Sequence, residues 1–246
     1  MKTAVQQPLR RIRLTHGGDS FEVRITRGGG ERLSITVHPD LRVTAKAPQS
    51  ASDEAIRKRI ELRAGWIGRQ RATFRLNRPL PAKRKYVSGE THFYLGRQYT
   101  LKIRASREEE VSLSGGYLRV TTPTPGNTRQ VGHLLNEWFS NRAHIVLTQR
   151  FKLCLERVRP MGIKCSKLVL RSMRNRWGSC SINSRVTLNL NLIKVPAHCI
   201  EYVIIHELCH IKVMNHKPAF FRLLSQIVPD WEQRKARLNS FILPEQ

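Results

Sequence analysis

EYVIIHELCHIKVMNH, residues 201–216, is the stretch that decides how this chain is expected to fold. It contains the pattern H-E-x-x-H at 206–210, and a further histidine, His216, follows. In a helix, His206 and His210 are one turn apart on the same face, so both imidazoles can bind one zinc ion. Glu207 lies beside them and can act as general base on a water next to the metal. The stretch therefore predicts a catalytic zinc site.

A buried helix is expected to carry this pattern. Pro196 suits the first turn of a helix. Apolar residues follow at helical spacing and leave the edge with His206 and His210 facing a cleft. These residues are Cys199, Ile200, Val203, Ile204, Leu208 and Ile211.

His216 and Glu232 can each complete the ligand set. His216 stands at the metzincin spacing, although Val213 occupies the position where those proteins usually have Gly. We therefore place the turn at Asn215, which accepts a left-handed conformation more readily than a β-branched residue. Glu232 is the alternative ligand, and Cys180 is a less favoured candidate. We favour His216, with one zinc ion per chain.

Several motifs around this pattern are specific enough to carry a family resemblance. They are RWGSCS (176–181), VTLNLNLIKVP (186–196), EYVIIHELCHI (201–211), NHKPAFF (215–221) and PDW (229–231), with weaker segments at 33–48 and 86–103. The chain thereby resembles the YgjP-like metallopeptidase domain family of predicted zinc-dependent hydrolases, which is similar to SprT-type and Wss1-type zincin proteases. The resemblance implies that His206, His210 and His216 bind the metal and that Glu207 is the catalytic base. Phe221 stands where the family more often has Trp, an exchange of one aromatic residue for another.

An α+β fold with two regions is expected. Residues 1–126 are predicted to form an antiparallel β-rich region, because apolar residues alternate at 21–25, 33–37, 43–47, 93–103 and 111–120. Gly115-Gly116 indicates a hairpin turn. One helix is expected within this region, at about 52–74. The segment TTPTPGN (121–127) marks the boundary with a zincin-like catalytic domain at 127–246.

The catalytic domain is predicted to begin with a long helix at about 128–158. Its expected apolar face consists of Leu134, Leu135, Trp138, Phe139, Ile145, Val146 and Leu153. A half-buried strand at 186–192 is expected to border the cleft and to pair with an extended substrate. Asn189 and Asn191 on its polar face, and Trp177 as a cleft wall, are candidate substrate-binding residues. Tyr202, one helical turn before His206, is a candidate for stabilising an oxyanion.

The chain is strongly basic, with a formal net charge of +26. Residues 1–126 carry 25 basic and 11 acidic residues, and residues 127–246 carry 19 and 7, so the charge is not confined to a tail. Such a field attracts polyanions, and non-specific nucleic acid is therefore a possible partner. Arg57, Lys58, Arg59 and Arg63, on one face of the predicted helix, form either that contact or a solvated surface.

Five cysteines without a C-x-x-C pair, and no apolar run long enough for a signal peptide or a membrane span, indicate a cytoplasmic protein without a membrane partner. The expected function is a zinc-dependent hydrolase of the HExxH type, most simply a metallopeptidase acting on a protein or peptide. Two alternatives are a nucleic-acid-associated binding protein with a structural zinc site and a metal hydrolase of phosphoanhydrides.

Overall fold

The structure, a computed structural model, describes residues 10–38, 40–76, 84–174 and 176–241. It consists of two compact units, residues 1–81 and 82–246. Both contain helices and sheets, so the predicted α+β class is confirmed. The boundary between the units differs from the expected one at 126 and 127. The sheet of residues 91–122 shares its core with the helix that follows it, and both therefore belong to the second unit.

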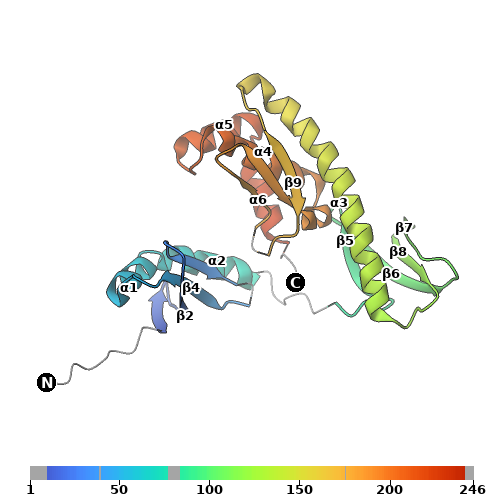
Figure 1. Ribbon diagram of the computed structural model, residues 1–246, viewed down its shortest axis with the longest axis horizontal. Helices are drawn as coiled ribbons and strands as arrows, with labels where there is room; N and C mark the ends of the chain where they lie inside the picture. The colour runs from blue at the N-terminus through green and yellow to red at the C-terminus, as the bar shows by residue number, and fades with distance from the viewer. Residues whose placement is uncertain (1–9, 39, 77–83, 175, 242–246) are drawn as a thin grey trace. The chain divides into compact units, whose positions relative to one another are not determined.

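The first unit is a four-stranded sheet covered on one face by two helices (Figure 1). Its strands are β1 (Arg11–His16), β2 (Asp19–Gly28), β3 (Ser34–Val37) and β4 (Val43–Pro48), and its helices are α1 (Asp53–Glu61) and α2 (Ala64–Leu76). Strand β1 was not predicted. The expected single helix at 52–74 is interrupted at Leu62 and Arg63, between α1 and α2.

The second unit begins with another four-stranded sheet, made of β5 (Thr91–Tyr94), β6 (Arg97–Ala105), β7 (Glu110–Ser114) and β8 (Tyr117–Thr122). The predicted turn at Gly115-Gly116 joins β7 to β8, and both glycines have positive φ, as a type I′ two-residue hairpin requires. The sheet packs against the first half of α3 (Thr128–Val158), whose predicted bounds are confirmed.

Neither of these sheets is fully antiparallel, which corrects the sequence-based expectation. Their strand orders are β1-β2-β4-β3 and β5-β6-β8-β7, and the central pairs β2–β4 and β6–β8 are parallel. Alternating apolar residues identify strands, and glycine turns identify hairpins. Neither pattern tells which strand of one hairpin pairs with which strand of the next. That choice depends on how the hairpins dock side by side.

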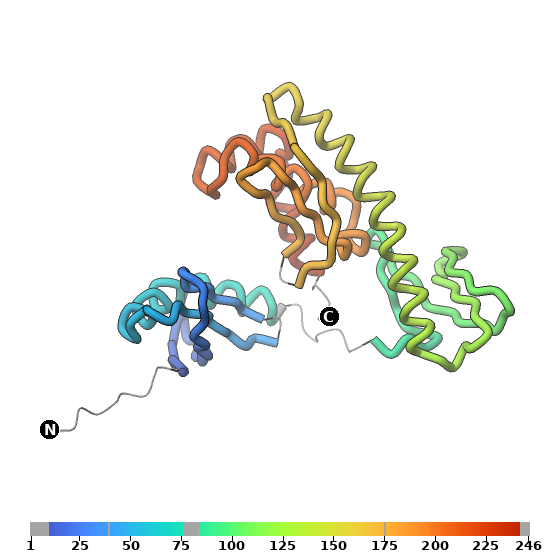
Figure 2. The backbone as a smooth tube through the Cα atoms, in the orientation of Figure 1, coloured from blue at the N-terminus to red at the C-terminus, as the bar shows by residue number. Residues whose placement is uncertain are grey.

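The long helix α3 runs from the β5–β8 sheet along the rest of the second unit (Figure 2). Its buried side agrees with the predicted face only in part, because Leu135 and Phe139 are buried as predicted but Ile145 and Leu153 are 58% and 62% exposed. The residues that it buries recur at helical spacing. They are Val131, Gly132, Leu135, Phe139, Ala143, Leu147, Phe151, Cys154 and Val158.

The remaining elements form a three-stranded sheet and a group of helices. The strands are β9 (Lys167–Arg171), β10 (Gly178–Cys180) and β11 (Arg185–Asn189), with β11 in the middle. Two short 3-10 helices, η1 (Arg159–Met161) and η2 (Leu190–Lys194), and three α-helices, α4 (Ala197–Lys212), α5 (Pro218–Ile227) and α6 (Trp231–Asn239), complete the unit. None of the helices in the described part of the chain is long and apolar enough to cross a membrane.

The β5–β6 hairpin fixes the start of α4. The backbone amides of Leu95 and Gly96 donate hydrogen bonds to the carbonyls of Ile193 and Lys194 at 2.8 and 3.1 Å. Gly96 has φ +80°, and a Cβ atom there would lie 2.9 Å from Cα of Pro196. Glycine is required at this contact, and the contact anchors the sheet to the residue that precedes α4.

Candidate metal centre

The helix α4 is buried on most of its circumference, as the sequence predicts. Cys199, Ile200, Ile204, Ile205 and Leu208 are each fully buried. The helix packs against α3, α5, α6 and β10. A helix held on so many sides presents its side chains with little freedom to move, which a metal site requires.

Three histidine side chains converge beside α4. Nε2 of His216 lies 3.0 Å from Nε2 of His206 and 3.1 Å from Nε2 of His210. Tetrahedral zinc, with Zn–N bonds of about 2.0–2.1 Å, separates its nitrogen ligands by about 3.3 Å. The spacing of these three nitrogens is therefore close to the spacing that zinc needs. They form the one group of three or more His, Cys, Asp or Glu side chains with metal-binding geometry in the described residues.

The hydrogen bonding of His210 leaves its Nε2 free for a metal. Nδ1 of His210 lies 3.1 Å from the carbonyl oxygen of Val213, which can only accept a hydrogen bond. Nδ1 therefore carries the proton, and Nε2 presents its lone pair to the other histidines. Burial lowers the pKa of His210 and His216, and burial together with the two neighbouring histidines lowers that of His206 to about 3. Three neutral imidazoles facing one another are suited to a shared cation.

The loop after α4 brings His216 back to the helix. The chain leaves the helix at Val213, whose φ is −134°, and bends at Asn215, where the turn was predicted. The bend does not use a left-handed residue, because none of residues 213–217 has positive φ. Phe220, on α5, is fully buried and lies beneath all three imidazoles, with ring centroids 4.5–4.9 Å from theirs.

Glu207 lies on the side of α4 that faces β10, against Gly178. A Cβ atom at position 178 would lie 2.7 Å from both Cγ and Oε1 of Glu207, so no other residue fits there without moving the carboxylate. Glu207 is 7% exposed, and burial raises its pKa to about 7, while the charge of Arg176 acts in the opposite direction. A carboxyl group with this pKa can accept and return a proton near neutral pH. Sequence reasoning missed Gly178, although RWGSCS contains it, because a glycine offers no functional group.

Asn189 does not face a cleft, contrary to the prediction. It is fully buried, and its side-chain amide donates to the carbonyls of Met173 and Arg176 at 2.7 and 2.9 Å. Its Oδ1 accepts from the amide of Asn191 at 3.0 Å. Asn189 therefore holds the segment that leads to Gly178, and its role in this structure is to shape the site.

The strand that was expected to bind substrate is also shorter than predicted. It ends at Asn189, and Asn191 belongs to the 3-10 helix η2, where it accepts a hydrogen bond from Lys194 Nζ at 2.7 Å. Because β11 lies between β9 and β10, both of its backbone edges are already paired. Trp177 is partly buried and packs on the core of the second unit. Within the described sheet, β10 is the edge strand beside α4.

The other candidates for the metal site lie elsewhere. Glu232 is exposed in the first turn of α6, and neither it nor Cys180 belongs to the histidine group. Tyr202, the candidate for stabilising an oxyanion, is 5% exposed, and its ring contacts that of His206 edge-on with the centroids 5.8 Å apart. Burial and the nearby charge of Glu207 raise the pKa of Tyr202 to about 12.

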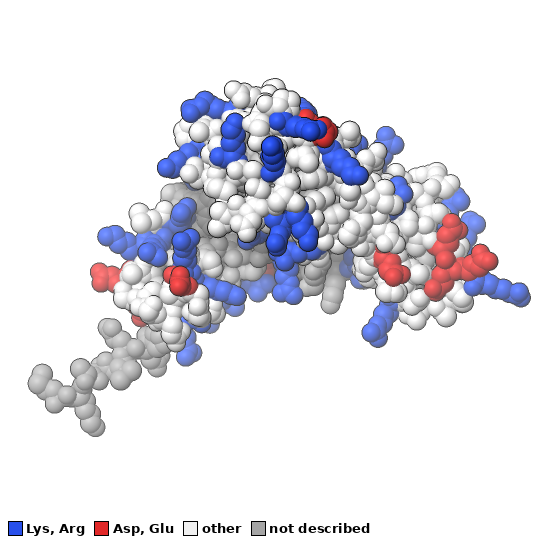
Figure 3. Space-filling model, turned by 45° about the horizontal axis from the view of Figure 1, so that its top comes forward, with Lys and Arg blue, Asp and Glu red and all other residues white. Residues whose placement is uncertain are grey.

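The basic residues singled out in the sequence belong to the first unit. Arg57, Lys58 and Arg59 lie on α1, and Arg63 lies just after it; all four are exposed. None of the ion pairs among the described residues includes them. Lys and Arg are spread over the face shown in Figure 3, with few Asp and Glu among them.

A family model described as "YgjP-like, metallopeptidase domain" matches residues 31–241. No curated protein matches the chain. Among solved structures, the chain is similar to the "metallopeptidase zymogen of Pyrococcus abyssi abylysin", with 17% sequence identity and a TM-score of 0.34. That match covers 37% of this chain and 90% of the other.

Proposed function

This chain belongs to the family of YgjP-like metallopeptidase domains, and from that premise we propose that it is a zinc-dependent peptidase with Glu207 as general base. The observation that carries the proposal is the convergence of three histidine nitrogens, with Nε2 of His216 at 3.0 and 3.1 Å from those of His206 and His210. A buried glutamate lies on the helix that carries His206 and His210. His206, His210 and His216 would hold one zinc ion per chain. Bound there, zinc would supply positive charge that polarises a carbonyl and acidifies water.

The chain's own residues would perform the proton transfers. Glu207 would take a proton from the attacking water and deliver it to the leaving amine of the cleaved peptide. Gly178 leaves room for the Glu207 carboxylate at the position that it occupies. An extended substrate would pair with the outer edge of β10, since β11 has no free edge.

Substitution of Glu207 and His210 tests these roles separately. Glu207→Gln should retain zinc and lose hydrolysis by about 10²–10⁴-fold, since a positioned general base contributes that much. His210→Ala should lose the zinc itself. The matched control is Glu232→Gln, a change of the exposed glutamate on α6 that should alter neither property.

Metal content by elemental analysis and cleavage of a mixed peptide pool are the two measurements. Equal cleavage by wild type and Glu207→Gln would exclude Glu207 as the base. Loss of zinc from Glu232→Gln would assign the third ligand to α6. Hydrolysis of tripolyphosphate without cleavage of any peptide would favour the phosphoanhydride alternative, and bound zinc without any hydrolysis would favour a structural site.

We infer a second, separate property from the exposed cations of the first unit, namely non-specific binding of nucleic acid. Its support is that Arg57, Lys58, Arg59 and Arg63 are exposed and form no ion pair among the described residues. Binding to phosphates should weaken steeply with salt, and the slope of log K against log salt should fall by about 0.9 for each lost contact on duplex DNA.

A charge-matched pair of variants tests this property. One variant replaces these four residues by Gln, and the other replaces four exposed cations of the second unit, Arg104, Arg107, Arg129 and Lys152. A mobility-shift titration at two salt concentrations should show the larger loss for the first variant. Equal losses would mean that total charge, and not this surface, attracts the nucleic acid.

A further inference from the structure

A row of aromatic rings leads away from the metal centre along α5 and α6. The ring of Phe221 lies 6.2 Å from that of His216, and Trp231 stacks on Phe221 at 5.1 Å with an interplanar angle of 27°. Nζ of Lys235 lies 5.6 Å from the centroid of the Trp231 ring. We call Phe221, Arg222, Trp231 and Lys235 the ledge. Its two aromatic rings lie between His216, a proposed metal ligand, and the ammonium group of Lys235.

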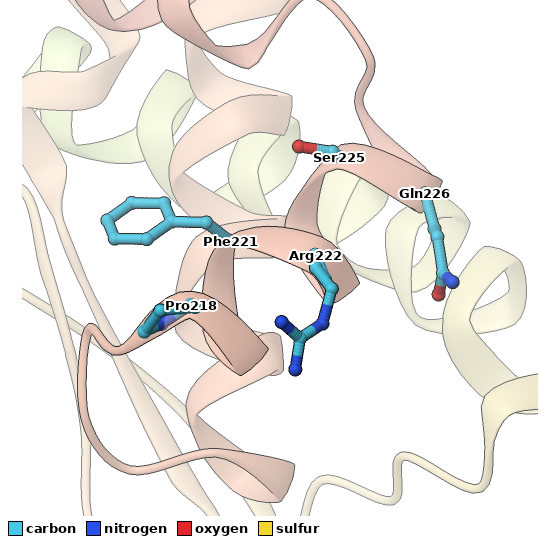
Figure 4. A pocket seen from close by; sticks show the side chains of 5 residues that line it. All are labelled: Pro218, Phe221, Arg222, Ser225 and Gln226. Carbon is cyan, nitrogen blue, oxygen red and sulfur yellow. The ribbon is translucent and has the colours of Figure 1, made fainter.

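The ledge is held in place from within. Nε1 of Trp231 donates a hydrogen bond to Oγ of Ser225 at 3.0 Å, which fixes the indole against α5. Phe221 and Trp231 are partly buried, so each ring also keeps some exposed surface. A shallow hollow beside Phe221 is lined by Pro218, Arg222, Ser225 and Gln226 (Figure 4). The hollow beside Phe221 therefore has both an aromatic ring and the side chain of Arg222 among its lining.

The two cations of the ledge have no carboxylate partner in the part of the chain that the structure describes. No ion pair among the described residues includes Arg222 or Lys235. Helix α5 contains no acidic residue. Asp230, the N-cap of α6, is already paired with Arg234 at 2.9 Å, and Glu232 in the first turn of α6 is exposed.

The other charge known to act on the site is positive as well. Burial raises the pKa of Glu207 to about 7, and the positive charge of Arg176 acts against that rise. Glu207 itself is buried and cannot neutralise the ledge at the surface. A ligand with negative charge is therefore favoured beside the metal centre.

We propose that the ledge binds an acidic side chain of the substrate, so that the enzyme prefers peptides with Asp or Glu beside the cleaved bond. This inference rests on the proposed peptidase function and names its substrate class. The carboxylate pairs with Arg222 or Lys235, while its methylene groups lie on the rings of Phe221 and Trp231. A basic side chain meets two like charges there.

The test compares two zinc-loaded variants on one pair of peptides. The peptides are acetylated and amidated, so that their only carboxylates are side chains, and differ by Glu or Gln at the residues flanking the cleaved bond. The wild type should cleave the Glu peptide with a kcat/KM about fivefold higher, the effect of an exposed ion pair, and mainly through KM. Arg222→Gln/Lys235→Gln should lose this preference. The control Arg129→Gln/Lys152→Gln, with the same change in charge at exposed positions on α3, should keep it.

Binding provides a second reading that does not depend on turnover. Calorimetry with the Glu207→Gln protein should give a lower Kd for the Glu peptide, and the two ledge substitutions should remove that difference. Zinc content equal to wild type verifies that the ledge variant is folded. If both peptides are cleaved equally, or if the ledge variant keeps the preference, the ledge proposal is wrong and the peptidase proposal stands. If the zinc-loaded wild type cleaves no peptide, both proposals are wrong.

Discussion

The two four-stranded sheets of this protein have the same architecture and very different surroundings. Their orders are β1-β2-β4-β3 and β5-β6-β8-β7, with the same parallel pair in the middle. The sequence LRVT occurs at 41–44, where it leads into β4, and again at 118–121, within β8. Each sheet is followed by a polar N-cap, Ser52 or Asn127, and a helix.

The difference lies in what the following helix does. In the first unit, α1 ends after 9 residues and contributes Ile56 and Ile60 to the core of its own unit. In the second unit, α3 continues for 31 residues and contributes Leu147, Phe151 and Val158 to a core that includes α4. The same sheet thus occurs once without and once with the proposed metal centre, so the strand order does not determine the function.

The largest expected effect tests whether the two cores are independent. Ile60→Ala in the first unit and Leu147→Ala in the second each remove a fully buried side chain, which costs about 2–5 kcal/mol. Unfolding in denaturant is monitored by hydrogen exchange and by zinc release. These two measurements should show that Ile60→Ala destabilises only residues 10–76. Leu147→Ala should lower the denaturant concentration at which zinc is released. Earlier zinc release from Ile60→Ala would show that the two units unfold together.

Lowering the pH should destabilise the second sheet more than the first, because one buried position of the second sheet is a histidine. His92 in β5 corresponds to Leu14 in β1. Each residue lies two positions before the last paired residue of its strand, at the turn of the hairpin. Burial is the main cause that lowers the pKa of His92 to about 4; its Nε2 lies 3.5 Å from Oε2 of Glu90, whose charge acts in the opposite direction. Between pH 6.5 and about 4 the unfolded chain therefore binds a proton that the folded chain does not, and stability falls as the pH falls.

The loss from His92 should reach about 3 kcal/mol near pH 4, at 1.36 kcal/mol for each pH unit. His92→Leu, which gives the second sheet the residue of the first, should reduce this loss in urea unfolding measured from pH 7 to 4.5. His144→Leu, a change of an exposed histidine on α3, is the control and should leave the slope as it is. An unchanged slope in His92→Leu would mean that His92 is protonated without cost in the folded protein.

The smallest of the three effects concerns a contact that only the second unit contains. Gly178→Ala should displace the Glu207 carboxylate, and a displacement of about 1 Å can reduce kcat by about 10²-fold, or 2.7 kcal/mol. The metal should stay bound, because the atoms nearest to a Cβ at position 178 belong to Glu207 and not to a histidine. Gly126→Ala, at a glycine with no neighbour within 4 Å, is the control. Wild-type kcat in Gly178→Ala, measured on the best peptide, would show that Glu207 needs no such placement.

The sequence alone determined the features that depend on local spacing. The interval between His206 and His210, the bounds of α3 and the hairpin at Gly115-Gly116 each follow from hydrogen bonds or periodicities within a few residues. The tertiary structure decided the contacts between distant segments. Asn189 is buried because Met173 and Arg176 offer their carbonyls to it, and Gly178 must be glycine because Glu207 lies against it. Such contacts leave no periodic pattern in the chain, since the partners meet only when separate elements pack together.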